Sequence, residues 1–112
     1  MKKEVLKWAD DRGLLKEENK FVQLAKLLEE SGELAKAIIK DDRVEQIDAI
    51  GDCVIVLTIL AKQLDLDIDW CTEKAFSVIK NRTGIMLNGS FIKDEDLKWT
   101  TSKHLEQKSK NL

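Results

Sequence analysis

The sequence predicts an all-α protein, a bundle of four main helices followed by a small C-terminal β-hairpin. Its 112 residues include no proline and only five glycines, which permits long uninterrupted helices. Apolar side chains recur at helical spacing in four segments, and one Asn-Gly pair marks a tight hairpin turn. With 43% apolar and 36% charged residues, the chain has the composition of one folded domain.

The first two helices are expected at residues 2–11 and 19–40. The first has a narrow apolar face and ends near Gly13. In the second, an apolar stripe repeats every three or four residues, and we expect it to face the core. The stripe consists of Phe21, Leu24, Leu27, Leu28, Ser31, Leu34, Ala35 and Ile38.

The third and fourth helices are expected at residues 43–64 and 68–81, capped by Asp42 and Asp67. The second half of the third helix is apolar on all sides, which places it inside a bundle or at an oligomer interface. The inner side of the fourth helix is predicted to consist of Trp70, Cys71, Ala75, Val78 and Ile79.

A β-hairpin over residues 85–92 follows, turning at Asn88-Gly89. We therefore expect a domain over residues 1–97 and a polar C-terminal tail over residues 98–112. The net charge of −2 argues against a nucleic-acid polymer as partner. Neither a leader peptide nor a membrane-spanning run is visible, so we expect a cytoplasmic protein without a membrane partner.

Acidic residues mark the candidate site. Glu29, Glu30 and Glu33 share one face of the second helix, opposite its apolar stripe. Asp48 and Asp52 form a stripe with Glu45 on the third helix, and this stripe leads into apolar surface. Neighbouring acids on an apolar helix need a cation, and Mg²⁺ prefers oxygen ligands. The alternative is an ordinary solvated helix surface.

Basic residues follow along and beyond the fourth helix, where they can hold phosphate oxygens. They are Lys74, Lys80 and Arg82, with Asn81 between the last two. Compensation of the helix dipole is the alternative role for such residues.

Taken in order, these pieces resemble the MazG-like nucleoside triphosphate pyrophosphohydrolases, within the all-α superfamily that includes dimeric dUTPases. The resemblance covers roughly residues 5–97. It rests on Trp8 with residues 12–14 (Arg-Gly-Leu), residues 23–34 with their Glu-Glu-Ser-Gly-Glu core, residues 48–52 (Asp-Ala-Ile-Gly-Asp), residues 79–84 (Ile-Lys-Asn-Arg-Thr-Gly) and residues 88–93 (Asn-Gly-Ser-Phe-Ile-Lys).

The resemblance implies Mg²⁺-dependent cleavage of a (d)NTP to (d)NMP and pyrophosphate, with Mn²⁺ as the alternative metal. Glu30 and Glu33 would bind metal and orient or deprotonate the attacking water, as general bases do. The further implied metal ligands are Glu29, Asp48 and Asp52. The implied substrate-binding residues are Trp8, Gln23, Lys26, Lys74, Lys80, Asn81 and Arg82.

The sequence departs from the family pattern at one position. The family usually has Glu-x-x-Asp before the apolar run, which would require an acid where this chain has Ala49. We expect Asp48, one turn before Asp52, to take that role.

Three other functions compete. They are a non-catalytic nucleotide- or partner-binding bundle, a four-helix carboxylate site for iron or manganese, and the related phosphoribosyl-ATP pyrophosphohydrolase. A carboxylate site usually needs histidines, and the chain has only His104, in the tail. The apolar surface of the third helix predicts a homodimer or homotetramer.

Overall fold

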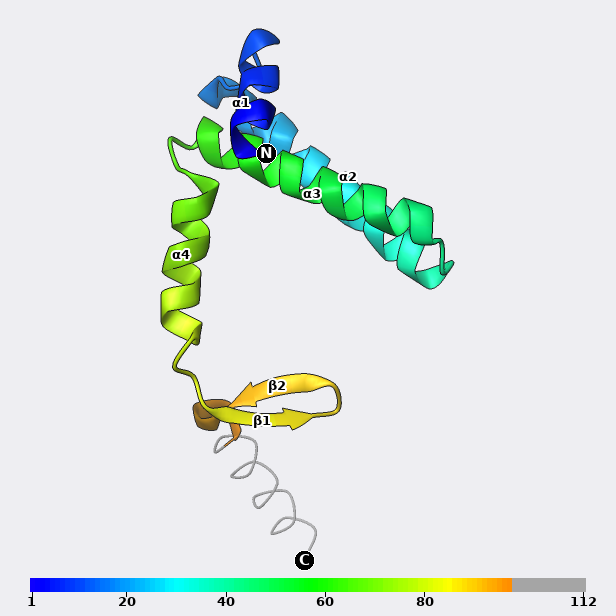
Figure 1. The fold of residues 1–112 in the computed structure, drawn as a ribbon, viewed down its shortest axis with the longest axis vertical. Helices are drawn as coiled ribbons and strands as arrows, with labels where there is room; N and C mark the ends of the chain where they lie inside the picture. The colour runs from blue at the N-terminus through cyan, green and yellow to red at the C-terminus, as the bar shows by residue number, and fades with distance from the viewer. Residues whose placement is uncertain (98–112) are drawn as a thin grey trace, which may run out of the picture. The chain divides into compact units, whose positions relative to one another are not determined.

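A computed structural model describes residues 1–97 (Figure 1), and the predicted tail lies outside them. The prediction of an all-α protein with a small C-terminal hairpin is confirmed, with an additional 3₁₀ helix, η1. The chain divides into two compact units, Met1–Thr72 and Glu73 onward. The elements are α1 (Lys2–Asp11), η1 (Glu17–Asn19), α2 (Lys20–Ile39), α3 (Arg43–Gln63), α4 (Ile68–Ile79), β1 (Gly84–Leu87) and β2 (Ser90–Lys93).

The first unit is built on an antiparallel hairpin of α2 and α3, joined by a very short turn (Figure 1). Asp41 has a left-handed backbone (φ 54°), which Asp tolerates better than most residues. The Asp42 N–H then donates to the carbonyl of Ala37 (2.9 Å). The Asp42 carboxylate accepts from the backbone N–H of Glu45 (3.2 Å), which confirms the predicted cap.

Alanine, larger aliphatic and polar side chains fill the contact between the two helices, which we call the inner seam. Its residues alternate at spacings of three and four, as in closely packed helix pairs. Two hydrogen bonds set the register: the Gln23 amide donates to the Val56 carbonyl (3.4 Å), and the Gln46 amide to the Ala37 carbonyl (3.3 Å). The inner seam consists of Gln23, Leu27, Glu30, Leu34 and Ala37 on α2, and Ala49, Asp52, Val56, Ile59 and Gln63 on α3.

The predicted core stripe of α2 is therefore confirmed only in part within the single chain, since Leu27 and Leu34 are half-buried in the inner seam. Phe21, Leu24, Leu28 and Ile38, which belong to the predicted core stripe, are 45–72% exposed. The face that α2 turns toward α3 combines Leu27, Leu34 and the buried Ala37 with polar residues, so the rest of its large apolar side chains lie outward.

The predicted inner side of α4 fails in the same way. No residue of α4 is buried, and Trp70, Val78 and Ile79 are exposed. Cys71 is half-buried. The predicted cap of α4 is confirmed, because the Asp67 carboxylate accepts from the backbone N–H groups of Asp69 (2.8 Å) and Trp70 (3.4 Å).

The ends of the first unit are joined by polar contacts. The amide of buried Gln63 donates to the carbonyl of Leu14 (2.6 Å), which ties the segment after α1 to the end of α3. The ammonium of Lys2 pairs with Asp67 (2.9 Å) and Asp69 (2.8 Å). These carboxylates raise the pKa of Lys2, and Lys2 in turn lowers the pKa of Asp67.

In the second unit, β1 and β2 pair antiparallel, with Ile85 opposite Ile92. Asn88 (φ 51°) and Gly89 (φ 82°) both have positive φ, as the predicted tight turn requires. A hydrogen bond from the Thr83 hydroxyl to the Asp94 carboxylate closes the base of the hairpin. Gly84 lies against the Ile92 carbonyl, where a Cβ atom would overlap it, so this position requires glycine.

Across residues 1–97, no helix combines the length and apolar character needed to cross a membrane.

Candidate functional site

Glu30 on α2 and Asp52 on α3 are two acids at the middle of the inner seam. Both side chains are half-buried, although carboxylates ordinarily lie at the surface. Partial burial raises the pKa of Glu30, and the negative charge of Asp52 raises it further. Lys26, one turn earlier, opposes the rise in pKa, while Glu29 and Glu33 add to it. The two helices therefore bring like charges together where water is partly excluded.

Such a pair of acids fits a divalent cation with oxygen ligands. Among residues 1–97, no three His, Cys, Asp or Glu side chains gather closely enough to hold a metal by themselves. Mg²⁺ is often bound by only one or two carboxylates, with water and substrate phosphates completing its shell. Glu30 and Asp52 match that arrangement, because their charges lie close enough to interact and Lys26 offsets only part of the resulting rise in the pKa of Glu30.

The other predicted metal ligands are more exposed than this pair, and their role stays a prediction. Glu29 and Asp48 are exposed, whereas Ala49 is buried (4% exposed) in the inner seam beside Asp52. Position 49 is thus the one from which an acid would face α2. Glu33 lies one turn beyond Glu30 and lines an adjacent pocket.

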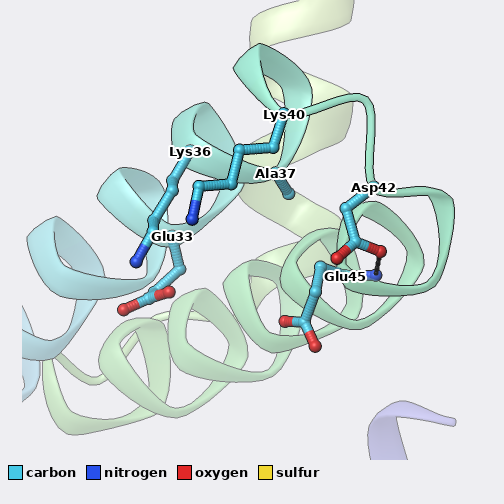
Figure 2. Close-up of a pocket in the computed structure, with 6 residues that line it drawn as sticks. All are labelled: Glu33, Lys36, Ala37, Lys40, Asp42 and Glu45. Carbon is cyan, nitrogen blue, oxygen red and sulfur yellow. Dashed lines mark hydrogen bonds between the residues drawn. The ribbon is translucent and has the colours of Figure 1, made fainter.

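That pocket has a volume of about 180 Å³ and lies beside the turn between α2 and α3 (Figure 2). Two of its residues, Lys36 and Lys40, were not predicted as site residues. Their four-residue spacing, beginning one turn after Glu33, is the sequence signal that would have revealed them. The pocket is lined by Glu33, Lys36, Ala37, Lys40, Asp42 and Glu45.

The predicted substrate-binding residues of the first unit have different surroundings. Gln23 is buried and uses its amide on the Val56 carbonyl, while Lys26 is exposed. Trp8 is 48% exposed and stacks under the Arg12 guanidinium, 4.2 Å from the ring centre. An apolar pocket of about 290 Å³ adjoins the Trp8 ring and is also lined by Glu4, Val5 and Ile55.

The remaining predicted phosphate-binding residues are Lys74, at the centre of α4, and Lys80, Asn81 and Arg82, which follow that helix. All four are exposed and belong to the second unit. Their interaction with substrate stays a prediction.

Part of the chain is similar to a bacteriophage protein. The chain is 42% identical over 65 residues to a protein of Haemophilus phage HP1 described as an uncharacterized 18.2 kDa protein in the rep-hol intergenic region. That similarity covers 58% of this chain and 40% of the phage protein. No solved structure matches the chain.

A family model for phosphoribosyl-ATP pyrophosphohydrolase matches residues 10–76, which is more than half of the chain. The matched region contains α2, α3 and every acid of the candidate site, and it ends before the β-hairpin. The chain therefore belongs to the phosphoribosyl-ATP pyrophosphohydrolase family, within the MazG-like all-α NTP pyrophosphohydrolase superfamily.

Proposed function

We propose that this protein is a Mg²⁺-dependent nucleoside triphosphate pyrophosphohydrolase that converts a (d)NTP to (d)NMP and pyrophosphate. The observation that carries the proposal is the opposed pair Glu30 and Asp52 at the middle of the inner seam. Family membership supports pyrophosphate-releasing hydrolysis of a nucleotide. The identity of the nucleotide and the need for metal are the proposed parts.

Glu30 and Asp52 would hold the cation, with Glu33 next to them. A bound Mg²⁺ supplies charge neutralisation of the phosphates and lowers the pKa of a coordinated water. Glu30 has a raised pKa, so its carboxylate is a stronger base than an exposed glutamate and is suited to accept a proton from the attacking water. Glu33 would orient that water from the neighbouring turn.

The first unit offers two proposed contacts to the substrate, one for the base and one for a phosphate. The exposed ring of Trp8 adjoins an apolar pocket suited to a nucleobase, which can stack on an aromatic face. Lys26 lies close enough to Glu30 to influence its charge and is placed to meet a phosphate oxygen. The further proposed phosphate contacts are Lys74, Lys80, Asn81 and Arg82.

We also propose that the protein is a homodimer or homotetramer. The outward faces of α2 and α3 expose large apolar side chains such as Leu28 (68%) and Ile50 (54%), which soluble chains rarely leave uncovered in such numbers. Replacing both residues by Asp should weaken self-association at least tenfold in sedimentation equilibrium, while Lys3→Asp should not. A wild-type chain that sediments as a monomer at micromolar concentration would contradict this proposal.

A second substrate, phosphoribosyl-ATP, is favoured by the family model that matches residues 10–76. It carries the same phosphoanhydride bond, so the acids would serve the same chemistry. The two substrates differ in the group attached to the base, which places the discrimination near the base pocket rather than at Glu30 and Asp52.

Product analysis tests the proposal. Purified protein is incubated with NTPs, dNTPs and phosphoribosyl-ATP, with and without Mg²⁺, and the products are separated by ion exchange. Monophosphate and pyrophosphate that appear only with metal are the expected result. Release of orthophosphate would contradict the assigned bond. Metal-dependent nucleotide binding without turnover would favour a non-catalytic binding bundle, and Ala49→Glu would then be the first variant to assay.

A further inference from the structure

The pocket beside the α2–α3 turn combines opposite charges that do not pair with one another. Lys36 and Lys40 share it with Glu33 and Glu45. Within residues 1–97, neither lysine forms an ion pair or a side-chain hydrogen bond. Two ammonium groups and two carboxylates therefore remain available to something that enters from outside.

Compensation of the helix dipole does not account for these lysines. A lysine that neutralises a helix C-terminus extends toward the last carbonyl groups. In Figure 2, the side chains of Lys36 and Lys40 instead run back along α2 toward Glu33. This direction follows from the tilt of Cα–Cβ bonds toward the helix N-terminus. Both ammonium groups consequently lie on the side of the candidate site.

A polyphosphate with its metal ion fits this mixture of charges better than a plain anion or a plain cation. Glu33 and Glu45 would repel a free anion, and the lysines would repel a free cation. A phosphate chain that carries Mg²⁺ presents both charges at once, so carboxylates can meet the metal and ammonium groups the phosphate oxygens. Asp42 is already occupied, since it caps α3.

The end of the inner seam that lies far from the α2–α3 turn is mostly apolar, in contrast to the charged pocket. Beyond Glu30 toward the start of α2, the seam contains Gln23, Val56 and Ile59, all buried, and the apolar pocket of Trp8 contacts this half of α3 through Ile55. In the other direction, Lys36 lies six residues after Glu30, a rise of about 9 Å along the helix. Along the α2–α3 hairpin, an apolar region is therefore followed by the acid pair and then by the lysines Lys36 and Lys40, unpaired within residues 1–97.

We infer that the Lys36–Lys40 pocket binds the distal phosphates of the substrate, so that the leaving pyrophosphate lies toward the α2–α3 turn and the nucleoside toward Trp8. This inference rests on the proposed function, because it assigns a direction to the substrate of that site. It adds Lys36 and Lys40 as substrate-binding residues.

Calorimetric titration of the full chain with inorganic pyrophosphate and Mg²⁺ tests the inference. Lys36→Gln/Lys40→Gln should weaken pyrophosphate binding at least tenfold, and should change nucleoside monophosphate binding less than twofold. Lys36→Arg/Lys40→Arg keeps both charges and should bind pyrophosphate within about threefold of wild type. Lys3→Gln, which removes an exposed charge from α1, is the matched control. Circular dichroism verifies that each variant is folded.

Two results overturn the inference: pyrophosphate binding that is equal in wild type and the Gln variant, or equal weakening of pyrophosphate and monophosphate. The proposed function fails separately. If the chain hydrolyses no nucleotide but the Gln variant still loses pyrophosphate binding, the inference about the pocket is supported and the proposed hydrolase activity is contradicted. If the Gln variant still hydrolyses nucleotide with an unchanged KM, the proposed activity is supported and the inference about the pocket is contradicted.

Discussion

The inner seam of the α2–α3 hairpin and the outer faces of the same two helices are built from opposite kinds of residue. The seam holds alanines, glutamines, four aliphatic side chains and the half-buried acids Glu30 and Asp52. The outer faces hold large apolar side chains such as Phe21, Leu28, Ile50 and Val54, which are 54–72% exposed. An ordinary amphipathic hairpin would bury such side chains and expose its acids.

The difference shows what each surface is suited to do. Small residues let two helices approach closely, which brings acids from both helices together, but they bury little apolar area. Each large apolar side chain left outside forgoes roughly 1.5–3 kcal/mol of burial. The seam is thus suited to hold charge, while the outer faces are suited to self-association, which would stabilise the pair from outside.

Removing an acid of the candidate site should have the largest effect. Asp52→Asn and Glu33→Gln should each reduce pyrophosphate release at least about 100-fold, because each removes a charge proposed to hold or orient the reacting groups. Glu18→Gln, at an exposed position in η1, should stay near wild type. Steady-state kinetics with Mg²⁺ measures the effect, and loss of helicity in the acid variants would mark those acids as structural instead.

Truncating matched isoleucines compares the two surfaces directly. Ile59→Ala, in the inner seam at 3% exposure, should lower the free energy of unfolding by about 2 kcal/mol or more. Ile50→Ala, on the outer face of the same helix, should cost less than about 0.5 kcal/mol in dilute solution. Urea unfolding over a range of protein concentrations distinguishes the effects of the two substitutions. The loss in free energy of unfolding caused by Ile50→Ala should increase as self-association increases. Equal costs at high dilution would contradict the assignment of faces.

Placing an acid at position 49 tests whether the inner seam is the metal-binding surface. Ala49→Glu should lower stability by about 1 kcal/mol without metal, because it adds a third negative charge to a partly buried surface. Added Mg²⁺ should raise the melting temperature of this variant more than that of wild type. Asp48→Ala, on the exposed neighbouring position, should change the metal effect less. If Asp48→Ala instead reduced the Mg²⁺-dependent rise in melting temperature strongly, the metal would have to be assigned to the exposed edge of α3.

The pH dependence of stability should report on Glu30 and is the smallest expected effect. Its pKa is raised in the folded chain, so the folded state holds this proton more tightly than the unfolded state does. That contribution is complete below the ordinary Glu pKa of about 4.3 and is lost as the pH rises through the raised value. At pH 7 without metal, Glu30→Gln should therefore stabilise the chain by about 0.5 kcal/mol.

Thermal melting from pH 4 to pH 8 measures this effect, with Glu18→Gln as the control. A wild-type curve whose slope matches that of Glu30→Gln would show that Asp52 and burial do not act on Glu30.

Local signals were sufficient to predict the order and type of the elements. Apolar spacing identified all four α-helices, Asp42 and Asp67 marked two of their starts, and Asn88-Gly89 marked the hairpin turn. These signals act between residues close in sequence, so they are readable from the chain alone. Glu30 and Asp52 were also identified from their spacing as candidate site residues.

Local signals could not predict which side of a helix packs against its neighbour, because that side depends on which partner the helix meets. The whole apolar stripe of α2 was predicted to form the core, but only Leu27 and Leu34 of its leucines are half-buried in the inner seam, while Leu24 and Leu28 are exposed. Likewise, Lys36 and Lys40 became part of a pocket only because the short turn brings Glu45 of α3 alongside them.

The sequence by itself determined the all-α class, the helix limits within about two residues, the hairpin turn and the two groups of acids. Only the tertiary structure decided that Glu30 lies near Asp52, that position 49 lies on the inner seam, and that large apolar residues such as Phe21 and Ile50 lie outside. The physical reason is that hydrogen bonding and capping act locally, whereas the side of a helix that packs against its neighbour depends on how closely the two helix surfaces approach. That distance is a property of both helices together.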